Sequence, residues 1–374
     1  MKKLSALILA FLLVVIFCPV TYAESEDLDS LKQQIDQRLE NSLDEDILGE
    51  LSEKGVTPTD SEAITQMDQR SFFEDLLDKL KQTAAEPVRM FGKILAVSLI
   101  YSAFELLSTE NGELKDAFGT VCVTGTVSLM SDALSSSFEA LQDSISAINT
   151  FMVSYIPVFA AVTTAGGHPA AAGVYSSSTI LVCEVTELVS SKLLIPFLSA
   201  VTAISIVSSI DPKLKISGVA DSIRKLTTWL LATVMLIFVG LMTVQGVTGS
   251  AADNLLSRTL RFAASSFIPV IGSSVSDAFL AVKSGMGVIR TAVGGFGMLA
   301  VFAIAVRPFL LIFSMKLTIW AGRVANELLG LHRTADFLKS INSVLSVGIS
   351  ILITITAAFL IATAALMAVV TQGG

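Results

Sequence analysis

The most apolar stretch of the chain is SVLSVGISILITITAAFLIATAALMAVV, residues 343–370. It carries no charged side chain, and as a helix it is long enough to cross the ~30 Å hydrocarbon layer of a bilayer. A second stretch, 226–248, also meets this length, and 193–210 is nearly as apolar. The sequence therefore predicts an all-α, polytopic membrane protein.

Other apolar stretches are shorter. Each would cross a bilayer only with its flanking residues, with local thinning of the membrane or as a re-entrant segment. A generous count gives ten membrane elements and a strict count gives six or seven. The shorter stretches include 94–107, 151–165 and 308–321.

The composition agrees with a membrane protein and excludes several other classes. Apolar residues make up 52% of the 374 positions and charged residues only 16%, where soluble domains have about 25%. The net charge of −8 offers no basic footprint for nucleic acid. Three cysteines and two histidines leave little material for a disulfide framework or a metal site. No nucleotide-binding loop or nucleophile–base arrangement is visible, so we expect neither a cofactor nor an enzyme.

The first 23 residues have the order of a cleavable signal peptide. Lys2 and Lys3 precede an apolar run over 4–17, and Thr21-Tyr22-Ala23 supplies small residues at positions −3 and −1 of a cleavage site. An uncleaved anchor helix is the alternative. After cleavage, the mature chain would begin at Glu24 outside the cytoplasm.

Residues 24–86 are predicted to form an acidic, extracytoplasmic helical domain. They hold 18 acids and 6 bases, a net charge of −12. Leu28, Leu31, Ile35 and Leu39 recur at the spacing of an amphipathic helix. Such a domain serves either as a solvated acidic cap or as a docking surface for a protein partner.

The membrane part contains an internal repeat with an offset of 112 residues. We therefore divide it into a first membrane repeat, 87–210, a second one, 226–322, and a final transmembrane helix, 343–374. Three matches share the offset without gaps: LM at 129–130 and 241–242, SYIPV at 154–158 and SFIPV at 266–270, and PFL at 196–198 and 308–310.

A basic segment follows each repeat. These two segments, 211–225 and 323–342, are predicted to be cytoplasmic loops under the positive-inside rule. With an outside N-terminus and the ten-element count, both segments lie inside. Each repeat then contributes four elements, so the two copies run parallel rather than inverted.

Interruptions of the apolar stretches are the first candidate functional positions. Proline removes a backbone donor, so Pro157 and Pro269 are expected to break or bend their helices at equivalent repeat positions. Paired interruptions of this kind can mark a transport pathway, whereas kinked packing helices are the simpler alternative. Gly166-Gly167 before His168-Pro169 indicates a turn, with a re-entrant loop as the alternative, and Gly272 follows the second proline segment.

Charged residues within or beside the apolar stretches are the second set of candidates. Glu184 and Glu187 are three residues apart and share a helix face. They either form structural ion pairs with Arg290 or Lys316 of the second repeat, or line a polar conduit.

With these segments in place, the chain resembles the stage III sporulation protein AE family of endospore-forming bacteria. The resemblance covers essentially the whole chain and depends on the order of its motifs rather than on one of them. After the signal peptide and acidic segment, these are IPV at 156–158, AGG at 165–167, FIPVIG at 267–272, SDA at 276–278, RVA at 323–325, LG at 329–330 and AD at 335–336.

The resemblance implies a multi-pass protein of the mother-cell membrane, facing the forespore and made after engulfment. It implies a component of a channel or secretion-like complex that is required for late gene expression in the forespore. The implied partners are ring-forming membrane proteins, a cytoplasmic ATPase and the lipid bilayer, and no nucleic acid. A stand-alone secondary transporter built from parallel repeats is the alternative function.

Overall fold

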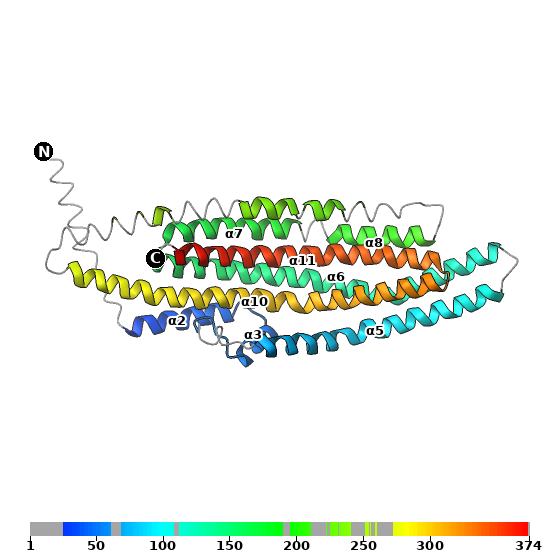
Figure 1. Ribbon diagram of the computed structural model, residues 1–374, viewed down its shortest axis with the longest axis horizontal. Helices are drawn as coiled ribbons and strands as arrows, with labels where there is room; N and C mark the ends of the chain where they lie inside the picture. Colours follow the sequence, from blue (N-terminus) through cyan, green and yellow to red (C-terminus); the bar gives the residue numbers. More distant parts are fainter. Residues whose placement is uncertain are drawn as a thin grey trace.

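The protein is a long bundle of helices in the computed structural model (Figure 1). The structure describes residues 25–60, 69–107, 112–189, 195–210 and 272–372, together with residue 222, most of 225–240, and residues 251–253, 255 and 259. The predicted signal peptide, Pro269 and most of the segment 211–225 lie outside the described residues.

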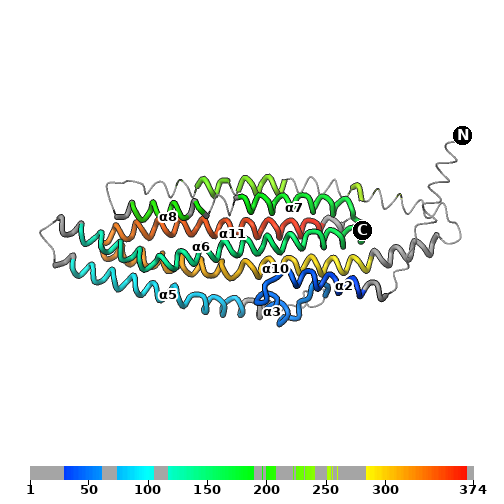
Figure 2. Tube along the Cα trace, turned by 180° about the vertical axis from the view of Figure 1, so that it is seen from behind, coloured from blue at the N-terminus to red at the C-terminus, as the bar shows by residue number. Residues whose placement is uncertain are grey.

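Every element among the described residues is a helix, as the sequence predicts. The main helices are α2 (Ser25–Glu40), α3 (Glu45–Glu53), α5 (Gln69–Leu107), α6 (Gly112–Ala165), α7 (Pro169–Val189), α8 (Ile195–Ile210), α10 (Gly272–Leu328) and α11 (His332–Gln372). Helix α10 packs along α5, α6 and α11, and α7 packs on α6 and α11. Both views of the bundle show the α10–α11 turn at one end and the α6–α7 turn at the other (Figures 1 and 2).

Four of these helices are long and apolar enough to cross a membrane, which confirms a multi-pass membrane protein. The candidate spans are Glu74–Phe104, Ala117–Ala165, Ser284–Leu328 and His332–Ala368. The count within the described residues is below the six to ten elements expected. Some short apolar stretches belong to longer helices: 151–165 is the last part of α6, and 308–321 lies in the C-terminal half of α10. The stretch 226–248 is only partly within the described residues.

The helices continue through segments that the sequence assigns to boundaries. Residues 323–342, predicted to be a basic loop, are helical except for a turn at 329–331. There the Leu331 N–H donates to the Asn326 carbonyl oxygen at 2.9 Å, and Gly330 has a φ of +76°, which favours glycine. Basic residues on the exposed side of a helix are compatible with helix formation, so charge alone did not mark a loop. Helix α5 likewise crosses the predicted domain boundary at 86–87 and carries Pro87 inside it.

The two N-terminal helices lie against the bundle. Ile35 and Leu39 of α2 and Leu51 of α3 are buried in the same core as the long helices. Ion pairs join this region to the start of α5: Lys54 lies 2.5 Å from Asp75, and Lys79 pairs with Glu50. The acidic segment is therefore attached to the bundle through apolar contacts and ion pairs.

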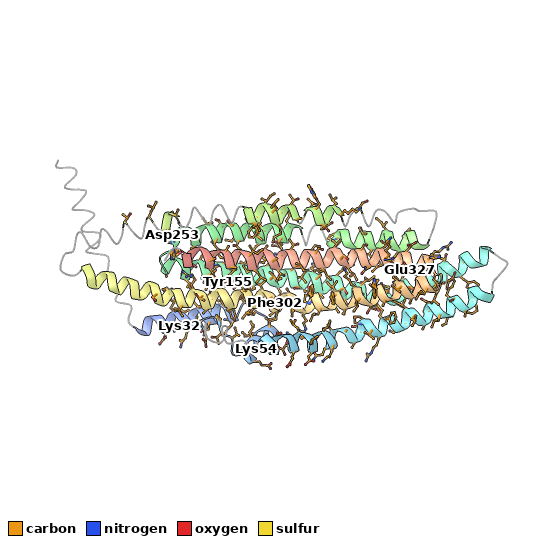
Figure 3. The ribbon with its side chains drawn as sticks, viewed as in Figure 1. Lys32, Lys54, Tyr155, Asp253, Phe302 and Glu327 are labelled. Atoms are coloured by element: carbon orange, nitrogen blue, oxygen red, sulfur yellow. The ribbon has the colours of Figure 1, made fainter. Side chains whose placement is uncertain are left out.

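Aromatic rings fill the space between α6, α7 and α10. Phe151, Tyr155 and Phe159 stack along one face of α6 with ring centroids 5.3–5.5 Å apart, and the Tyr175 ring meets Phe159 edge-on at 5.3 Å. The ring of Tyr155, which lies in the interior of the bundle in Figure 3, is fully buried. Opposite it, a Cβ atom at Gly297 would lie 2.3 Å from the Tyr155 ring. The glycine thus lets α10 approach α6 closely.

Gly294, one turn earlier on α10, does the same for α11. A Cβ atom there would lie 2.5 Å from the Met367 sulfur. Small residues at helix crossings are typical of membrane bundles, where close van der Waals packing holds the helices together. Because α10 touches both α6 and α11 at these glycines, the three helices form the centre of the bundle.

We predict that Gly297→Ala destabilises the protein by about 1–3 kcal/mol, because the added methyl group displaces the Tyr155 ring from a well-packed core. Gly285→Ala is the matched control, since a Cβ atom there meets nothing within 4 Å. The control is expected to be neutral or stabilising by up to about 1 kcal/mol through helix propensity. Thermal unfolding of both purified variants in detergent measures the difference. Equal unfolding midpoints would show that the α6–α10 contact does not depend on this glycine.

Candidate functional site

The turn between α6 and α7 is the best-defined polar site among the described residues. Helix α6 ends at Ala165, and the Gly167 N–H donates to the Thr164 carbonyl oxygen while the His168 N–H reaches the Thr163 carbonyl oxygen. Gly167 has a φ of +88°, the left-handed conformation that ends many helices. Pro169 then begins α7, a position where the missing N–H costs nothing. The predicted turn at Gly166-Gly167 is therefore present.

The first N–H groups of α7 are satisfied by a residue far away in the sequence. The Ala170 and Ala171 N–H groups donate to the two carboxylate oxygens of Asp253 at 2.8 and 2.9 Å. A negative charge at this position is stabilised by the helix dipole and by the charge-assisted hydrogen bonds. Figure 3 shows Asp253 at the bundle end where α7 begins.

His168 completes this cluster. Its Nδ1 lies 4.0 Å from Asp253 Oδ2, and both residues are buried, with 5% and 2% of their surface exposed. The sequence alone left His168 isolated, and Asp253 was missed. One signal was available: the His168-Pro169 start of α7 offers no Ser, Thr, Asp or Asn as a cap, so the acceptor had to come from elsewhere.

Among the described residues, the predicted conduit positions lie apart from one another, and their role in a conduit stays a prediction. Pro157 lies within helix α6, which continues past it, so of the predicted break or bend the structure shows no break at this position. It is exposed on the outer side of α6, whereas Gly166 is buried and lies against Met286 of α10. Gly272 is the first residue of α10. A helix accommodates a proline where the lost hydrogen bond is compensated by its surroundings.

The predicted intramembrane charges also separate. Glu184 and Glu187 are both exposed on α7, and Lys316 donates a hydrogen bond to Ser346 Oγ at 2.6 Å. Arg290 is buried with 8% of its surface exposed, and its Nε has no hydrogen-bond partner among the described residues. The expected ion pairs between the two repeats are therefore not seen within the described part of the chain.

A cleft of about 260 Å³ separates the α2–α3 connection from α6. Five of its lining side chains carry oxygen atoms: Ser42, Asp44, Asp143, Ser146 and Thr150. The others are apolar: Leu43, Ile47, Ala147 and Ile304. Nearby on α2, burial raises the pKa of Asp36 above its ordinary value, and burial and the Asp36 charge raise that of Glu40. We call this the acidic cleft; its chemistry suits a cationic or hydroxyl-rich partner surface.

We predict that Asp253→Ala loosens the start of α7, because two buried N–H groups lose their acceptor. The expected cost is about 1–3 kcal/mol. Hydrogen exchange of the Ala170 and Ala171 amides should become faster, while Asp132→Ala, which removes an exposed carboxylate on α6, serves as the control. Unchanged exchange at these two amides would contradict the capping role of Asp253.

Comparison with known proteins identifies the family of this chain. No solved structure matches the chain. Over 312 residues it is 25% identical to the stage III sporulation protein AE of Bacillus subtilis (strain 168), covering 78% of this chain and 77% of that protein. The family model described as stage III sporulation protein AE matches residues 59–370. The chain therefore belongs to the stage III sporulation protein AE family.

Proposed function

We propose that this protein is a multi-pass membrane component of the channel, or secretion-like complex, that joins mother cell and forespore after engulfment and is required for late forespore gene expression. The observation that carries the proposal is the family match over residues 59–370. The four long apolar helices support a membrane-embedded component. The proposal includes no enzymatic step and no cofactor.

The length of the helices supports a component that reaches beyond the bilayer. Helices α6 and α10 have 54 and 57 residues. At 1.5 Å per residue they are roughly 80 Å long, about twice the full thickness of a bilayer including its headgroups. Even at the steepest usual tilts, a large part of each helix must lie outside the hydrocarbon.

The charged N-terminal helices indicate which part lies outside. Asp46 of α3 pairs with Arg307 of α10 at 3.3 Å, and the acidic cleft opens beside Asp143 of α6. Exposed carboxylates are costly in hydrocarbon, so we place this level of the bundle, and the acidic segment with it, in the space between the two membranes. There the acidic face is available to partner proteins.

The basic residues near the α10–α11 turn support the orientation. Arg323, Arg333 and Lys339 lie close to this turn, at the end opposite the α6–α7 turn. Under the positive-inside rule, we place this end in the mother-cell cytoplasm. The family's cytoplasmic ATPase would meet the protein on this side, and the ring-forming membrane proteins would surround its outer half.

The packed interior bears on how the protein contributes to a channel. The rings of Phe151, Tyr155, Phe159 and Phe296 occupy the space between α6 and α10. A pathway for solutes does not fit through this part of a single chain. We therefore propose that the protein forms part of a channel wall or scaffold together with other subunits, rather than acting as a transporter alone.

Association with sporulation proteins tests the proposal. We expect that crosslinking in sporulating cells, followed by purification of the full-length chain, recovers ring-forming membrane proteins and the ATPase of the complex. Cells sampled before engulfment provide the control. If the purified protein instead binds and is stabilised by a small solute without any partner, the stand-alone transporter is the better function.

Cysteine labelling tests the orientation. In growing cells that express the chain, a membrane-impermeant maleimide should label Gly173→Cys near the α6–α7 turn and leave Lys215→Cys unlabelled until the cells are broken. Gly173 is exposed and has open space around its Cβ position, so the change is tolerated. The native Cys122 and Cys183 are buried and add little background. The reverse labelling pattern would invert the proposed topology.

A further inference from the structure

Arg290 is a buried cation without a partner in the described part of the chain. It lies on α10, one turn beyond Met286, which packs against Gly166 of the α6–α7 turn. Its Nε–H is buried and finds no hydrogen-bond acceptor among the residues that the structure describes. Within the described ranges this guanidinium forms no ion pair, in contrast to Arg307 and Arg323, which pair with Asp46 and Glu327.

Helices α6 and α11, which pack along α10, carry no carboxylate in their parts toward this end of the bundle. Between Asp143 and the end of α6, and between Asp336 and the end of α11, the sequence has no Asp or Glu. Asp253 lies at the same end of the bundle, but its two oxygens accept the Ala170 and Ala171 N–H groups and face His168. An isolated buried charge is strongly unfavourable unless it is paired.

The surface beside Arg290 is open on the side from which a partner could arrive. Gly287 precedes Arg290 by three residues and shares its helix face, and a Cβ atom at Gly287 would meet nothing within 4 Å. Thr291 is exposed, and so is Val288, with 56% of its surface accessible. A small residue next to an accessible apolar one permits the close approach of another helix.

We propose that Arg290 is the docking point for a carboxylate carried by a helix of another polypeptide. Guanidinium and carboxylate groups form bidentate hydrogen bonds, which gives the contact both strength and direction. The apolar contact over Gly287 and Val288 offsets the loss of water from the two charges. The inference rests on the proposed function, in which the protein works within a complex.

A polypeptide partner is favoured over a lipid by the position of Arg290. Starting at the basic end, α10 passes Arg307, where the charged helix α3 packs, before it reaches Arg290. In the proposed orientation Arg290 lies at the outer end of the candidate span Ser284–Leu328, where partner proteins in the intermembrane space reach it. The open face at Gly287 suits a closely packed helix better than a mobile lipid.

Site-specific crosslinking in sporulating cells tests the docking contact. The full chain carries p-benzoylphenylalanine at position 291, and the crosslinked peptide is identified by mass spectrometry. We expect an acidic residue within one or two turns of the crosslinked position on the partner. Arg290→Glu should reduce the crosslink by about 30-fold or more, as expected when one member of a buried pair is removed. Changing the partner's acidic residue to Arg should restore it.

Two further variants separate docking from folding. Arg290→Met keeps the size of the side chain and removes the uncompensated charge, so we expect loss of the crosslink together with an unchanged or raised unfolding midpoint. Arg290→Lys keeps the charge without the planar fork and should retain part of the crosslink. Arg89→Glu, which reverses an exposed charge on α5, is the control and should leave the crosslink unchanged.

Other outcomes would overturn the inference. A full crosslink with Arg290→Met, or a lowered unfolding midpoint with the crosslink retained, means that Arg290 serves the fold of its own chain. If phosphatidylglycerol vesicles stabilise the wild type more than phosphatidylcholine vesicles do, and do not stabilise Arg290→Met, Arg290 binds a lipid phosphate instead. If inorganic phosphate alone has this effect, Arg290 binds a free anion. If the wild type crosslinks to no sporulation protein, the proposed function is wrong. If it crosslinks to sporulation proteins and the crosslink does not depend on Arg290, only this inference is wrong.

Discussion

At Gly297 the ring of Tyr155 occupies the place that a side chain on α10 would take. Inside a membrane, burial of apolar surface gives helices little reason to associate, because lipid tails are as apolar as leucine side chains. Close contact between backbone and ring therefore carries much of the attraction between α6 and α10, and Gly294 against Met367 does the same between α10 and α11. The remaining helices pack around this central group of three.

The sequence was sufficient for the fold class and for the turns, but not for the continuity of the helices. Gly166-Gly167 before a proline is unambiguous, because a left-handed residue followed by a residue without an N–H ends one helix and begins another. The basic residues of 323–342 did not mark a loop, because they occupy exposed or half-buried positions of two helices joined by a three-residue turn. Pro157 lies on the outer side of α6, and the helix continues past it without a break. The duplication with an offset of 112 stays a prediction from sequence.

Contacts between residues far apart in the sequence are the part of the site that local sequence patterns do not predict. Asp253 and the start of α7 are separated by 82 and 83 positions, and only the arrangement of the helices brings the carboxylate to the Ala170 and Ala171 amides. Within the described part of the chain, the same arrangement leaves Arg290 without a carboxylate partner, although α7 carries two glutamates. Glu184 and Glu187 lie on the exposed side of that helix, and so cannot neutralise a guanidinium that is buried in the bundle.

The apolar side chains on the outer surface of the bundle also support a protein that works within a complex. On α6 and α7, Val153, Leu181 and Leu188 each have more than half of their surface exposed. Such residues are unremarkable where lipid covers them, but helices roughly 80 Å long cannot be covered by lipid along their whole length. Wherever the helices leave the hydrocarbon, exposed apolar side chains require another protein surface to remain soluble. Because its apolar helices are longer than the hydrocarbon layer, this chain is better suited to an assembly of several subunits than to a monomer in the membrane.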